Sequence, residues 1–451
     1  MRKYALRNTV LDVLIRIDEQ GGYSHLLINH ELKKNQIAAI DERLLTEIVY
    51  GTLQHKLYLD YVIDEFVKSN QRLKPWVRML LRMSIYQMFF LDKVPDHAII
   101  HEAVEIAKQR GHRGIASLVN GVLRNVQRQG RPNLDSIKDP IKRLAIETSH
   151  PQWLVERWVK SYGYDTTEAM CQANLNHKPI SVRVQALRIQ RQEAMKQLEQ
   201  EGFTVKPSPI SEQGITIEEG NILKSSLFLD GLLTIQDQSS MLAGQMLAPI
   251  PGMQVLDTCS APGGKATHLA ELMENMGTVK AHDLHDKKIR LIKEKAKQLQ
   301  LSIIDASAMD ARKLGSLYSP ESFDRILVDA PCSGLGVIRG KPDIKYSKQE
   351  ADIARLSIIQ SDILETVAPL LKQGGKLVYS TCTVDPAENT EVVSQFLNRH
   401  PDYEVDPTFF TELPDTLQQS IGVSKYGLQI FPQQYETDGF FLVRFVRHGR
   451  K

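Results

Sequence analysis

From Thr234 to the C-terminus, short apolar runs alternate with helical stretches, and this alternation constrains the fold more than any other feature of the sequence. The runs lie at 254–256, 277–281, 301–304, 326–328 and 376–379, and residues 438–445 supply a final strand pattern. Strands that alternate with helices form parallel βαβ units, and their sheet carries helices on both faces. Residues 236–451 are therefore predicted to form a doubly wound, Rossmann-like α/β domain.

The rest of the chain carries different patterns. Residues 1–135 show apolar side chains at helical spacing without long strand signals, which predicts a self-contained all-α bundle. Residues 150–235 mix short strand patterns with helices, as in a small α/β region. With 451 residues, of which 42% are apolar and 24% charged, the chain is expected to be a multidomain globular protein.

The cysteines argue against a metal site and for a reducing compartment. The four are Cys171, Cys259, Cys332 and Cys382, and no two of them have C-x-x-C spacing. We therefore expect no zinc site, no disulfide framework and a cytoplasmic location. The N-terminus has no apolar signal segment, and the most apolar stretch, 79–91, is interrupted by Arg82. That stretch is predicted to be a buried helix, so no membrane partner is expected.

A basic window lies near the end of the predicted bundle. Residues 1–148 contain 23 Lys plus Arg against 17 Asp plus Glu, and no acidic residue occurs between Ile106 and Leu134. Such a window can neutralise phosphates of a nucleic acid. A solvated helical face would have the same composition, so the residues alone leave both interpretations open.

The first strand of the predicted sheet ends in a glycine-rich turn. The turn comprises Cys259, Ser260, Ala261, Pro262, Gly263, Gly264 and Lys265, and a helix is expected from Ala266. Glycines allow the backbone to approach a ligand, and a helix N-terminus offers free N–H donors. Asp283 ends the second strand, where a carboxylate typically accepts hydrogen bonds from a ribose. This combination indicates a nucleoside cofactor.

The turn belongs to neither of two common nucleotide-binding classes. It lacks the dinucleotide pattern G-x-G-x-x-G, and it lacks the upstream glycine and the Ser/Thr of a Walker A loop. S-adenosylmethionine is the natural candidate, with Asp310 at the end of the third strand near the adenine. The alternative makes Asp283 and Asp310 helix caps.

Two further strands end in cysteines. Asp329 and Cys332 follow the strand at 326–328, and Cys382 follows the strand at 376–379. Carboxyl ends of parallel strands meet at one edge of a sheet, so both thiols and the carboxylate are expected to face one crevice. A free Cys is also a common buried core residue, which is the alternative interpretation.

This set of groups suits methylation at carbon 5 of cytosine. A thiolate that adds to carbon 6 turns carbon 5 into an enamine-like nucleophile, which is covalent catalysis. Asp329 would hydrogen-bond the N3 edge of the ring, and Lys265 would support that carboxylate or the base. The second thiol would assist release of the adduct. Spacing alone leaves open which cysteine attacks.

At these residues the sequence resembles the RNA cytosine-5 methyltransferases of the Nol1/Nop2/Sun family. The shared motifs are Cys-Ser-Ala-Pro-Gly-Gly-Lys (259–265), Asp-Ala-Pro-Cys-Ser-Gly (329–334) and Ser-Thr-Cys-Thr (380–383), and the likeness covers 236–446. One departure is Arg-Val-Gln-Ala-Leu (183–187), where the family usually has Arg-Val-Asn-Thr-Leu. Motifs between Val94 and Arg124 are similar to the RNA-binding helical domain of the antitermination factor NusB.

The resemblance implies roles for individual residues. Cys382 would be the nucleophile and Cys332 would aid product release, with Asp329 and Lys265 completing the catalytic site. The loop 259–265 would bind S-adenosylmethionine together with Asp283, Asp310 and Asp329. The NusB-like fusion implies RNA docking by residues 1–135 and 16S rRNA as the partner, with cytosine-967 as the target. We expect the protein to act as a monomer.

Other functions fit the sequence less well. A DNA cytosine methyltransferase would carry a large target-recognition insert, and an amino-methylating enzyme would have an Asn/Asp-Pro-Pro-aromatic turn at 329–332. An RNA-binding or antitermination-type regulator with a methyltransferase-like domain would not need both thiols. A C5-methyltransferase that acts on another RNA stays open.

Overall fold

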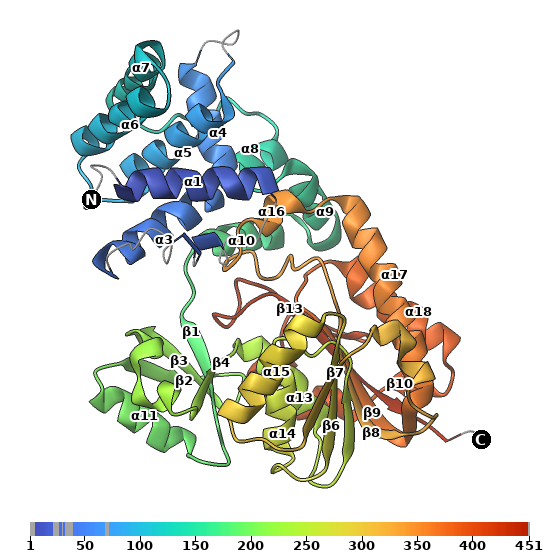
Figure 1. The fold of residues 1–451 in the computed structure, drawn as a ribbon. Coiled ribbons are helices and arrows are strands. Elements are labelled where there is room, and N and C mark those ends of the chain that lie inside the picture. Colours follow the sequence, from blue (N-terminus) through green and yellow to red (C-terminus); the bar gives the residue numbers. More distant parts are fainter. Residues whose placement is uncertain (1–4, 21–26, 29, 32–38, 68–71, 450–451) are drawn as a thin grey trace. The chain divides into compact units, whose positions relative to one another are not determined.

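The computed structural model describes residues 5–20, 27–28, 30–31, 39–67 and 72–449. The chain divides into two compact units, and it crosses between them more than once. The first unit comprises residues 1–176 and 340–347, and the second comprises 177–339 and 348–451. Each is described by itself below (Figure 1).

The first unit is helical, as the spacing of its apolar residues predicts. Its helices are α1 (Ala5–Gln20), α3 (Ala39–Gln54), α4 (Lys56–Phe66), α5 (Pro75–Phe90), α6 (Asp96–Arg110), α7 (Arg113–Gln129), α8 (Pro140–Glu147), α9 (Gln152–Tyr162), α10 (Tyr164–Leu175) and α16 (Ile344–Ser347). Helices α9 and α10, at the start of the predicted middle region 150–235, pack in this unit.

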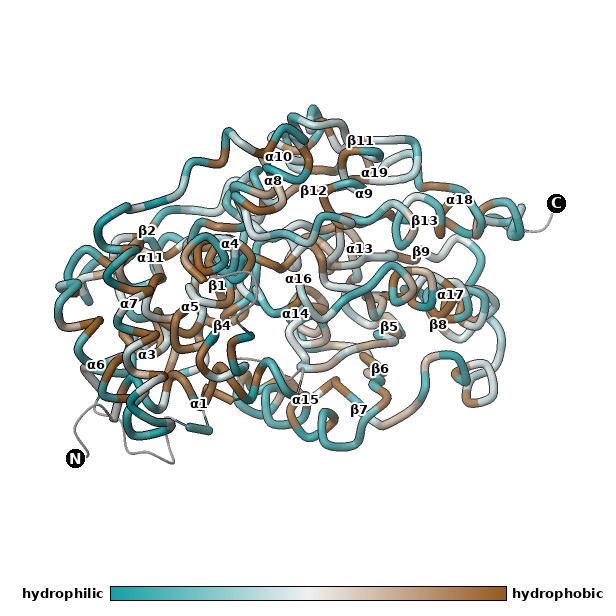
Figure 2. The backbone as a smooth tube through the Cα atoms, turned by 90° about the horizontal axis from the view of Figure 1, so that it is seen from above, coloured by the Kyte–Doolittle hydropathy of each residue, from teal (hydrophilic) through white to brown (hydrophobic). Residues whose placement is uncertain are grey.

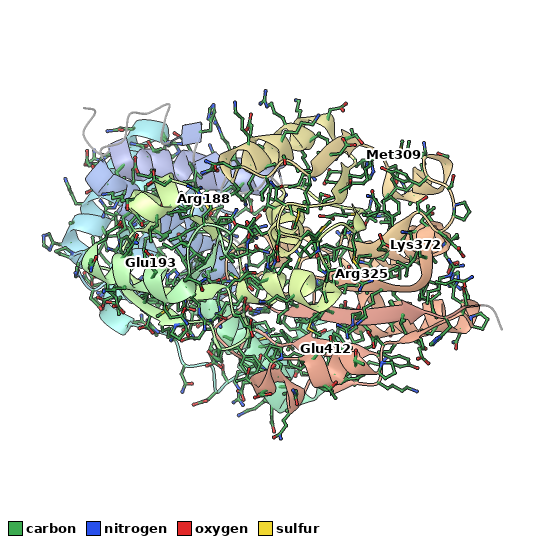
Figure 3. All side chains as sticks on the ribbon, turned by 90° about the horizontal axis from the view of Figure 1, so that it is seen from below. Arg188, Glu193, Met309, Arg325, Lys372 and Glu412 are labelled. Atoms are coloured by element: carbon green, nitrogen blue, oxygen red, sulfur yellow. The ribbon has the colours of Figure 1, made fainter. Side chains whose placement is uncertain are left out.

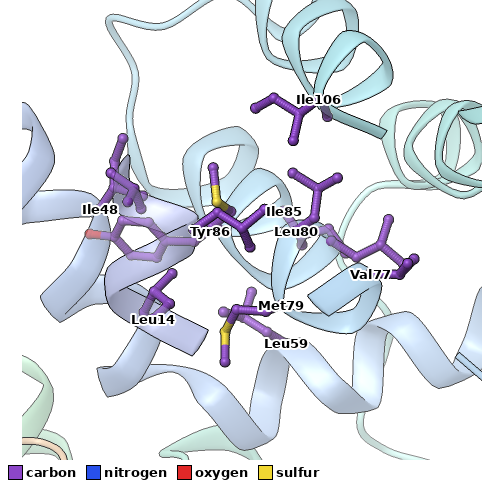
Figure 4. Close-up of a cluster of buried hydrophobic side chains, with 14 of the residues drawn as sticks. Leu14, Ile48, Leu59, Val77, Met79, Leu80, Ile85, Tyr86 and Ile106 are labelled. Atoms are coloured by element: carbon purple, nitrogen blue, oxygen red, sulfur yellow. The ribbon is translucent and has the colours of Figure 1, made fainter. Parts of the chain in front are cut away.

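Helix α5 lies at the centre of this unit. It begins with Pro75 at its first turn, where a missing N–H is harmless, and it contains the apolar stretch predicted to be a buried helix. Leu80 and Ile85 are fully buried among side chains of the surrounding helices, including Leu59 and Ile106 (Figure 4). Figure 2 shows how hydrophobic and hydrophilic residues alternate along these helices.

The short segment 340–347 belongs to this unit although it follows the Cys332 loop in sequence. Lys345 is fully buried, and its Nζ donates a hydrogen bond to the Gln54 carbonyl oxygen over 2.8 Å. The hydroxyl of Tyr346 donates to the carbonyl oxygen of Ser149 over 3.0 Å. These two side chains anchor the segment among the helices.

The second unit begins with a small antiparallel sheet. Its strands are β1 (Ile180–Val184), β2 (Thr204–Pro207), β3 (Gly214–Glu219) and β4 (Leu233–Ile235), in the order β2-β3-β1-β4. Helix α11 (Arg191–Gln200) buries Ala194 and Leu198 in a small core with strand residues such as Val182 and Ile215. The strand and helix positions agree with the predicted small α/β region, and β4 was not expected.

A larger mixed sheet makes up most of the second unit. Its strands are β5 (Gln254–Asp257), β6 (Thr278–Asp283), β7 (Ile304–Ala308), β8 (Phe323–Asp329), β9 (Leu371–Thr381), β10 (Tyr403–Val405), β11 (Val423–Ser424), β12 (Gly427–Ile430) and β13 (Phe440–Arg447). The order is β11-β12-β13-β9-β8-β5-β6-β7, with β10 paired to β13. The strands β9-β8-β5-β6-β7 are parallel, and β10 to β13 extend them antiparallel.

Alternate residues of each central strand face two separate cores. Val255 and Leu327 pack under α13 (Gln238–Leu247), α14 (Gly264–Leu272) and α15 (Asp286–Gln298). Leu256 and Ile326 face the opposite core, under α17 (Glu350–Val367) and α18 (Thr390–Arg399). The doubly wound, Rossmann-like fold is thus confirmed. The predicted final strand at 438–445 corresponds to β13, but its antiparallel pairing and the strands β10 to β12 were not predicted. The third strand lies at 304–308 rather than 301–304.

Polar side chains fasten the end of this sheet opposite the strand C-termini. Asp324 accepts a hydrogen bond from the backbone N–H of Gln254 over 2.9 Å and one from Lys372 Nζ over 2.7 Å. Arg325 donates through Nε to the Leu247 carbonyl oxygen at the end of α13. Figure 3 labels Lys372 and Arg325 among the side chains of this unit. The candidate active site lies at the other end of the sheet, at the carboxyl ends of the parallel strands.

Candidate active site

The glycine-rich loop connects β5 to α14, as predicted. Gly263 caps α14 with φ +100°, a conformation that L side chains rarely adopt, and a Cβ on it would lie 3.2 Å from Ile292 Cα. Gly264 opens the helix, and the Ala261–Pro262 peptide bond is cis. The loop therefore depends on glycine at 263 for both its turn and its close approach to α15.

Backbone hydrogen bonds hold the loop against the neighbouring strand. The N–H of Ser260 donates to the carbonyl oxygen of His282 in β6, and the N–H of Gly263 donates to the carbonyl oxygen of Ser260, each over 2.7 Å. The Ser260 hydroxyl donates to the carbonyl oxygen of Asp257 over 3.0 Å. The first N–H groups of α14 point into the same turn without intrahelical acceptors.

Asp257 is a member of this site that sequence reasoning missed. It ends β5 and is fully buried, and neither carboxylate oxygen has a donor in full hydrogen-bond geometry; the Ser260 side chain and the Cys259 backbone N–H lie close enough only to lower its pKa in part. Burial, with the charge of Asp329 as the second cause, raises the pKa of Asp257 to about 7. Its position directly before the loop was the available signal. A buried carboxylate without a partner is costly, so it suits a site completed by a polar ligand.

Asp283 and Asp310, two of the three carboxylates predicted to bind the cofactor, lie at neighbouring strand ends. Asp283, at the end of β6, is nearly buried, and its Oδ1 accepts from the backbone N–H of His285 over 3.3 Å. Asp310 follows β7 and caps a 3₁₀ turn by accepting from the Arg312 N–H over 3.0 Å. Hydrogen bonds from the Arg312 side chain lower the pKa of Asp310. The alternative interpretation as a helix cap therefore holds for Asp310. It does not hold for Asp283, which lies before His285, the N-cap of α15.

Lys265 and Asp329 form an ion pair across the strand ends. Lys265 Nζ lies 2.8 Å from Asp329 Oδ2, and the hydroxyl of Ser380 donates to Asp329 Oδ1 over 2.8 Å. Ser380 is the partner of Asp329 in the parallel pairing of β8 with β9. The carboxylate is thus held on both oxygens, one by the cofactor loop and one by the strand that leads to Cys382.

The surroundings of Lys265 favour its charged form. Burial by itself lowers the pKa of Lys265, but the attraction of Asp329 and their hydrogen bond outweigh it, so the pKa lies above its ordinary value. A charge on Cys382 raises it further. Because such coupling is reciprocal, the Lys265 ammonium would stabilise a thiolate on Cys382. Nζ also lies 5.5 Å from the centre of the Phe440 ring.

Cys332 and Cys382 lie together, as expected for two strand ends at one edge. Their Sγ atoms are 3.2 Å apart. The hydrogen bond to Cys382 is the largest cause that raises the pKa of Cys332, and burial adds to it. The third cysteine, Cys259, lies in the cofactor loop, and burial raises its pKa to about 12, so it remains a thiol at neutral pH.

A buried glutamate holds the Cys332 loop. Glu388 is fully buried and accepts from the backbone N–H of Ser333 over 2.8 Å and from the Ser333 hydroxyl. Gln360 of α17 donates to both Glu388 and the Pro331 carbonyl oxygen, each over 3.0 Å. Residues on either side of Cys332 are therefore fixed by side chains that sequence reasoning did not assign. The Asp-Pro-Ala-Glu-Asn motif at 385–389 was the signal.

An asparagine from the same motif holds the Cys382 loop. Asn389 accepts from the Thr381 hydroxyl over 2.6 Å and donates to the Thr383 carbonyl oxygen over 3.1 Å, so it spans both neighbours of Cys382. On the other side, the Gly336 N–H donates to the Cys382 carbonyl oxygen over 2.9 Å. A Cβ on Gly336 would lie 2.0 Å from the Gly439 carbonyl oxygen, so only glycine fits there.

The structure thus joins the four predicted catalytic side chains. Lys265, Asp329, Cys332 and Cys382 are linked by one ion pair, one thiol contact and the coupling of Lys265 to Cys382. The cofactor loop begins this group, and Asp283 and Asp310 lie along the same sheet edge toward β7. The arrangement combines two adjacent thiols, a cation coupled to one of them, and a carboxylate held on both oxygens.

Among the described residues, no group of three or more His, Cys, Asp or Glu side chains is arranged to hold a metal ion. Within the same part of the chain, no helix is both long and apolar enough to cross a membrane.

Family models match three consecutive parts of the chain. The NusB family matches residues 5–128, a ferredoxin-like domain of RsmF/B-like methyltransferases matches 150–222, and the 16S rRNA methyltransferase RsmB/F family matches 244–446.

Individual proteins match over most of the chain. The chain is 48% identical over 449 residues to the probable ribosomal RNA small subunit methyltransferase B of Bacillus subtilis (strain 168), covering 100% of each. The crystal structure of PH0851 matches with a TM-score of 0.82 and 29% identity over 99% of both chains. A methyltransferase homolog protein from Pyrococcus horikoshii matches with a TM-score of 0.60 and 30% identity, over 69% of this chain and 100% of its own. This chain belongs to the 16S rRNA methyltransferase RsmB/F family.

Proposed function

We propose that this protein transfers a methyl group from S-adenosylmethionine to carbon 5 of a cytosine in 16S rRNA through a covalent adduct on Cys382. One observation carries the proposal. The Sγ atoms of Cys332 and Cys382 lie 3.2 Å apart, beside the Lys265–Asp329 ion pair and the glycine-rich loop. Two thiols suit a reaction that needs one group to attack and another to assist release.

The loop 259–265 and its surroundings fit S-adenosylmethionine. The left-handed Gly263 leaves space for close backbone approach, and the N-terminus of α14 supplies N–H donors. Asp283 at the end of β6 suits the ribose hydroxyls, and Asp310 lies farther along the same edge. The unpartnered oxygens of Asp257 suit a cationic or N–H group of a ligand. When bound, the cofactor supplies the electrophilic methyl group.

The residues divide the work as follows. Cys382 loses its proton to solvent, and its sulfur forms a bond to carbon 6 of the cytosine while N3 takes up a proton, so that the electron pair of the 5,6 double bond becomes available at carbon 5. Lys265 stabilises the thiolate before attack, and the Asp329 carboxylate accepts a hydrogen bond from the N3–H that forms during the addition. Carbon 5 then takes the methyl group. Water takes the proton of carbon 5, the electron pair re-forms the 5,6 double bond, and Cys382 leaves as a thiolate; Cys332 assists this release.

The RNA partner and the target position are the finer part of the proposal. Similarity over the full length to a small subunit rRNA methyltransferase B, and the match to a 16S rRNA methyltransferase family, support 16S rRNA as the substrate. We propose cytosine-967 as the target nucleotide from the resemblance of the sequence motifs alone. The helical unit would bind the RNA. The protein would act as a monomer. Its basic window includes the exposed Arg124 and Arg128 on α7 and the exposed Arg131 just after it, which suits phosphate contacts.

A denaturing-gel trapping experiment tests the assignment of the two thiols. Wild type, Cys332→Ala and Cys382→Ala are each incubated with S-adenosylmethionine and small-subunit rRNA. We expect a slow-migrating protein–RNA adduct in Cys332→Ala alone, because attack still occurs and release is impaired. An adduct only in Cys382→Ala would exchange the two roles.

The same experiment distinguishes the alternatives. No adduct in any lane together with no methyl incorporation would indicate another RNA substrate or a regulator with a methyltransferase-like domain. Repeating the reaction with rRNA in which cytosine-967 is replaced by uridine tests the target. Unchanged methyl incorporation into that RNA would refute the position and leave the reaction intact.

A further inference from the structure

Arg183 is a fully buried arginine on β1, in the small sheet outside the methyltransferase sheet. Its side chain does not pack within that small sheet. It reaches α14, the helix that follows the cofactor loop, and contacts residues of its first two turns. A guanidinium group is seldom buried away from solvent unless all of its N–H groups donate hydrogen bonds.

All five N–H groups of Arg183 have acceptors. Nε and Nη2 donate to the two carboxylate oxygens of Glu271 over 2.8 and 2.7 Å, as a bidentate pair. The second N–H of Nη2 faces the Thr267 hydroxyl oxygen at 3.1 Å. Nη1 donates to the Gly264 carbonyl oxygen over 2.8 Å and to the side chain of Gln236. Three of the five bonds therefore end on α14 side chains, and one ends on its first backbone carbonyl.

Thr267 extends these contacts into the loop itself. Its hydroxyl lies 2.8 Å from the Gly263 carbonyl oxygen and 3.1 Å from that of Gly264. Arg183 thus contacts Gly264 directly and Gly263 through Thr267. These two residues form the turn whose left-handed φ and helix N-terminus shape the proposed cofactor site, and Lys265 follows immediately.

We propose that Arg183 is a positioning residue for methyl transfer: it holds the first turn of α14, and so the Gly263–Lys265 turn, in the geometry that binds the cofactor. The inference rests on the proposed use of loop 259–265 as the S-adenosylmethionine site. It gives the four-stranded sheet a task in the reaction, because the side chain that fixes the cofactor loop comes from β1.

The balance of charges beside the first turn of α14 is consistent with a positioning role for Arg183. A lone cation beside a helix N-terminus is unfavourable, but Glu271 neutralises Arg183, and both side chains are almost fully buried. Lysine would keep the positive charge but lose the planar, forked set of N–H donors. A single ammonium cannot donate to both Glu271 oxygens and to the Gly264 carbonyl oxygen in the same plane. The identity of the residue, and not only its charge, is therefore expected to matter.

The test compares Arg183→Lys with a matched change in the same unit. Arg444 is also fully buried and paired, with Nε 2.7 Å from Asp406 Oδ2 and Nη1 2.6 Å from Glu412 Oε2, and none of its hydrogen bonds reaches the cofactor loop (Figure 3 labels Glu412). The full-length wild type, Arg183→Lys and Arg444→Lys are compared by calorimetric binding of S-adenosylhomocysteine and by thermal unfolding.

We expect both variants to unfold at lower temperature, and only Arg183→Lys to lose affinity for S-adenosylhomocysteine, by about tenfold or more. Its affinity for rRNA should stay at the wild-type value. Equal binding of S-adenosylhomocysteine by all three proteins would overturn the inference and reduce Arg183 to a stabilising ion pair. Failure of the wild type to bind S-adenosylhomocysteine would instead refute the proposed cofactor site.

A milder variant keeps the test valid if Arg183→Lys does not fold. Thr267→Val preserves the shape of the side chain and removes the hydroxyl between Arg183 and the two glycine carbonyls. We expect weaker S-adenosylhomocysteine binding with a smaller change in unfolding temperature, and Thr267→Ser should restore wild-type affinity. Wild-type affinity in Thr267→Val would contradict the proposed route to the loop.

Discussion

The Sγ atoms of Cys332 and Cys382 lie 3.2 Å apart, although 50 residues separate them in the chain. Parallel pairing of β8 with β9 brings the two loops to the same sheet edge. Glu388 and Asn389, which are adjacent in the chain, then fix one loop each. The two thiols are therefore held together by the fold and by one short motif.

Oxidation should inactivate the protein reversibly through these thiols. A disulfide needs sulfurs about 2.05 Å apart, so a small movement suffices. Hydrogen peroxide would take two protons and two electrons from the pair and leave two water molecules and a Cys332–Cys382 disulfide. We expect lost methyl transfer that dithiothreitol restores, with the crosslinked peptide detected by mass spectrometry. The recovery of activity by dithiothreitol should disappear in Cys332→Ala, because this disulfide cannot form there. Detection of a crosslink to Cys259 instead would contradict the geometry.

Asp329→Asn should slow methyl transfer by about 10²-fold or more at saturating cofactor, because it removes the carboxylate that accepts from the N3–H of the ring and pairs with Lys265. The pKa of Lys265 should also fall, since Asp329 is what raises it. Single-turnover transfer of a labelled methyl group measures the rate. Ser380→Ala, which removes only the donor to Asp329 Oδ1, is the control, and an equal loss in both variants would contradict the assignment.

Glu388→Gln should impair release more than attack. The neutral amide cannot accept from both the N–H and the hydroxyl of Ser333 while keeping Gln360, so the Cys332 loop loses its anchor. We expect accumulation of the protein–RNA adduct in the trapping gel and a loss of about 1–3 kcal/mol in the free energy of unfolding. The exposed Glu350→Gln at the start of α17 should change neither. Lost stability without adduct would refute the link to Cys332.

Lys345→Met should remove a pH dependence of stability. Burial lowers the pKa of Lys345 from 10.5 to about 7, so the unfolded chain binds more protons between these values. The free energy of unfolding should then rise with pH in that window, by up to about 1.4 kcal/mol per pH unit. Thermal unfolding from pH 6 to about 10 in both proteins measures the difference.

The groups around Lys345 do not titrate in that window, which makes the comparison clean. Burial lowers the pKa of His55 to about 3 and that of His150 well below its ordinary value, and it raises the pKa of Cys171 to about 12. The variant should therefore show a flatter profile than wild type. Parallel profiles would mean that Lys345 keeps its proton in the folded protein.

Local sequence patterns were sufficient for much of this description. Alternating apolar runs predicted β5, β6, β8 and β9 because buried parallel strands are short and continuously apolar. Glycine at 263 and the cysteines at 332 and 382 were recognisable because turns and nucleophiles need particular residue types. The antiparallel strands β10 to β12 were missed, since they are short and take their stability from pairing: β10 and β12 pair with β13, and β11 pairs with β12.

By itself, the sequence determined the class of each domain and the chemical groups of the site, because periodicity and residue type are local properties. Only the tertiary structure decided which groups meet. The pairing of Lys265 with Asp329 and the reach of Arg183 from β1 to Gly264 both join residues far apart in the chain. Their contacts depend on strand order and burial, and no spacing in the sequence encodes these directly.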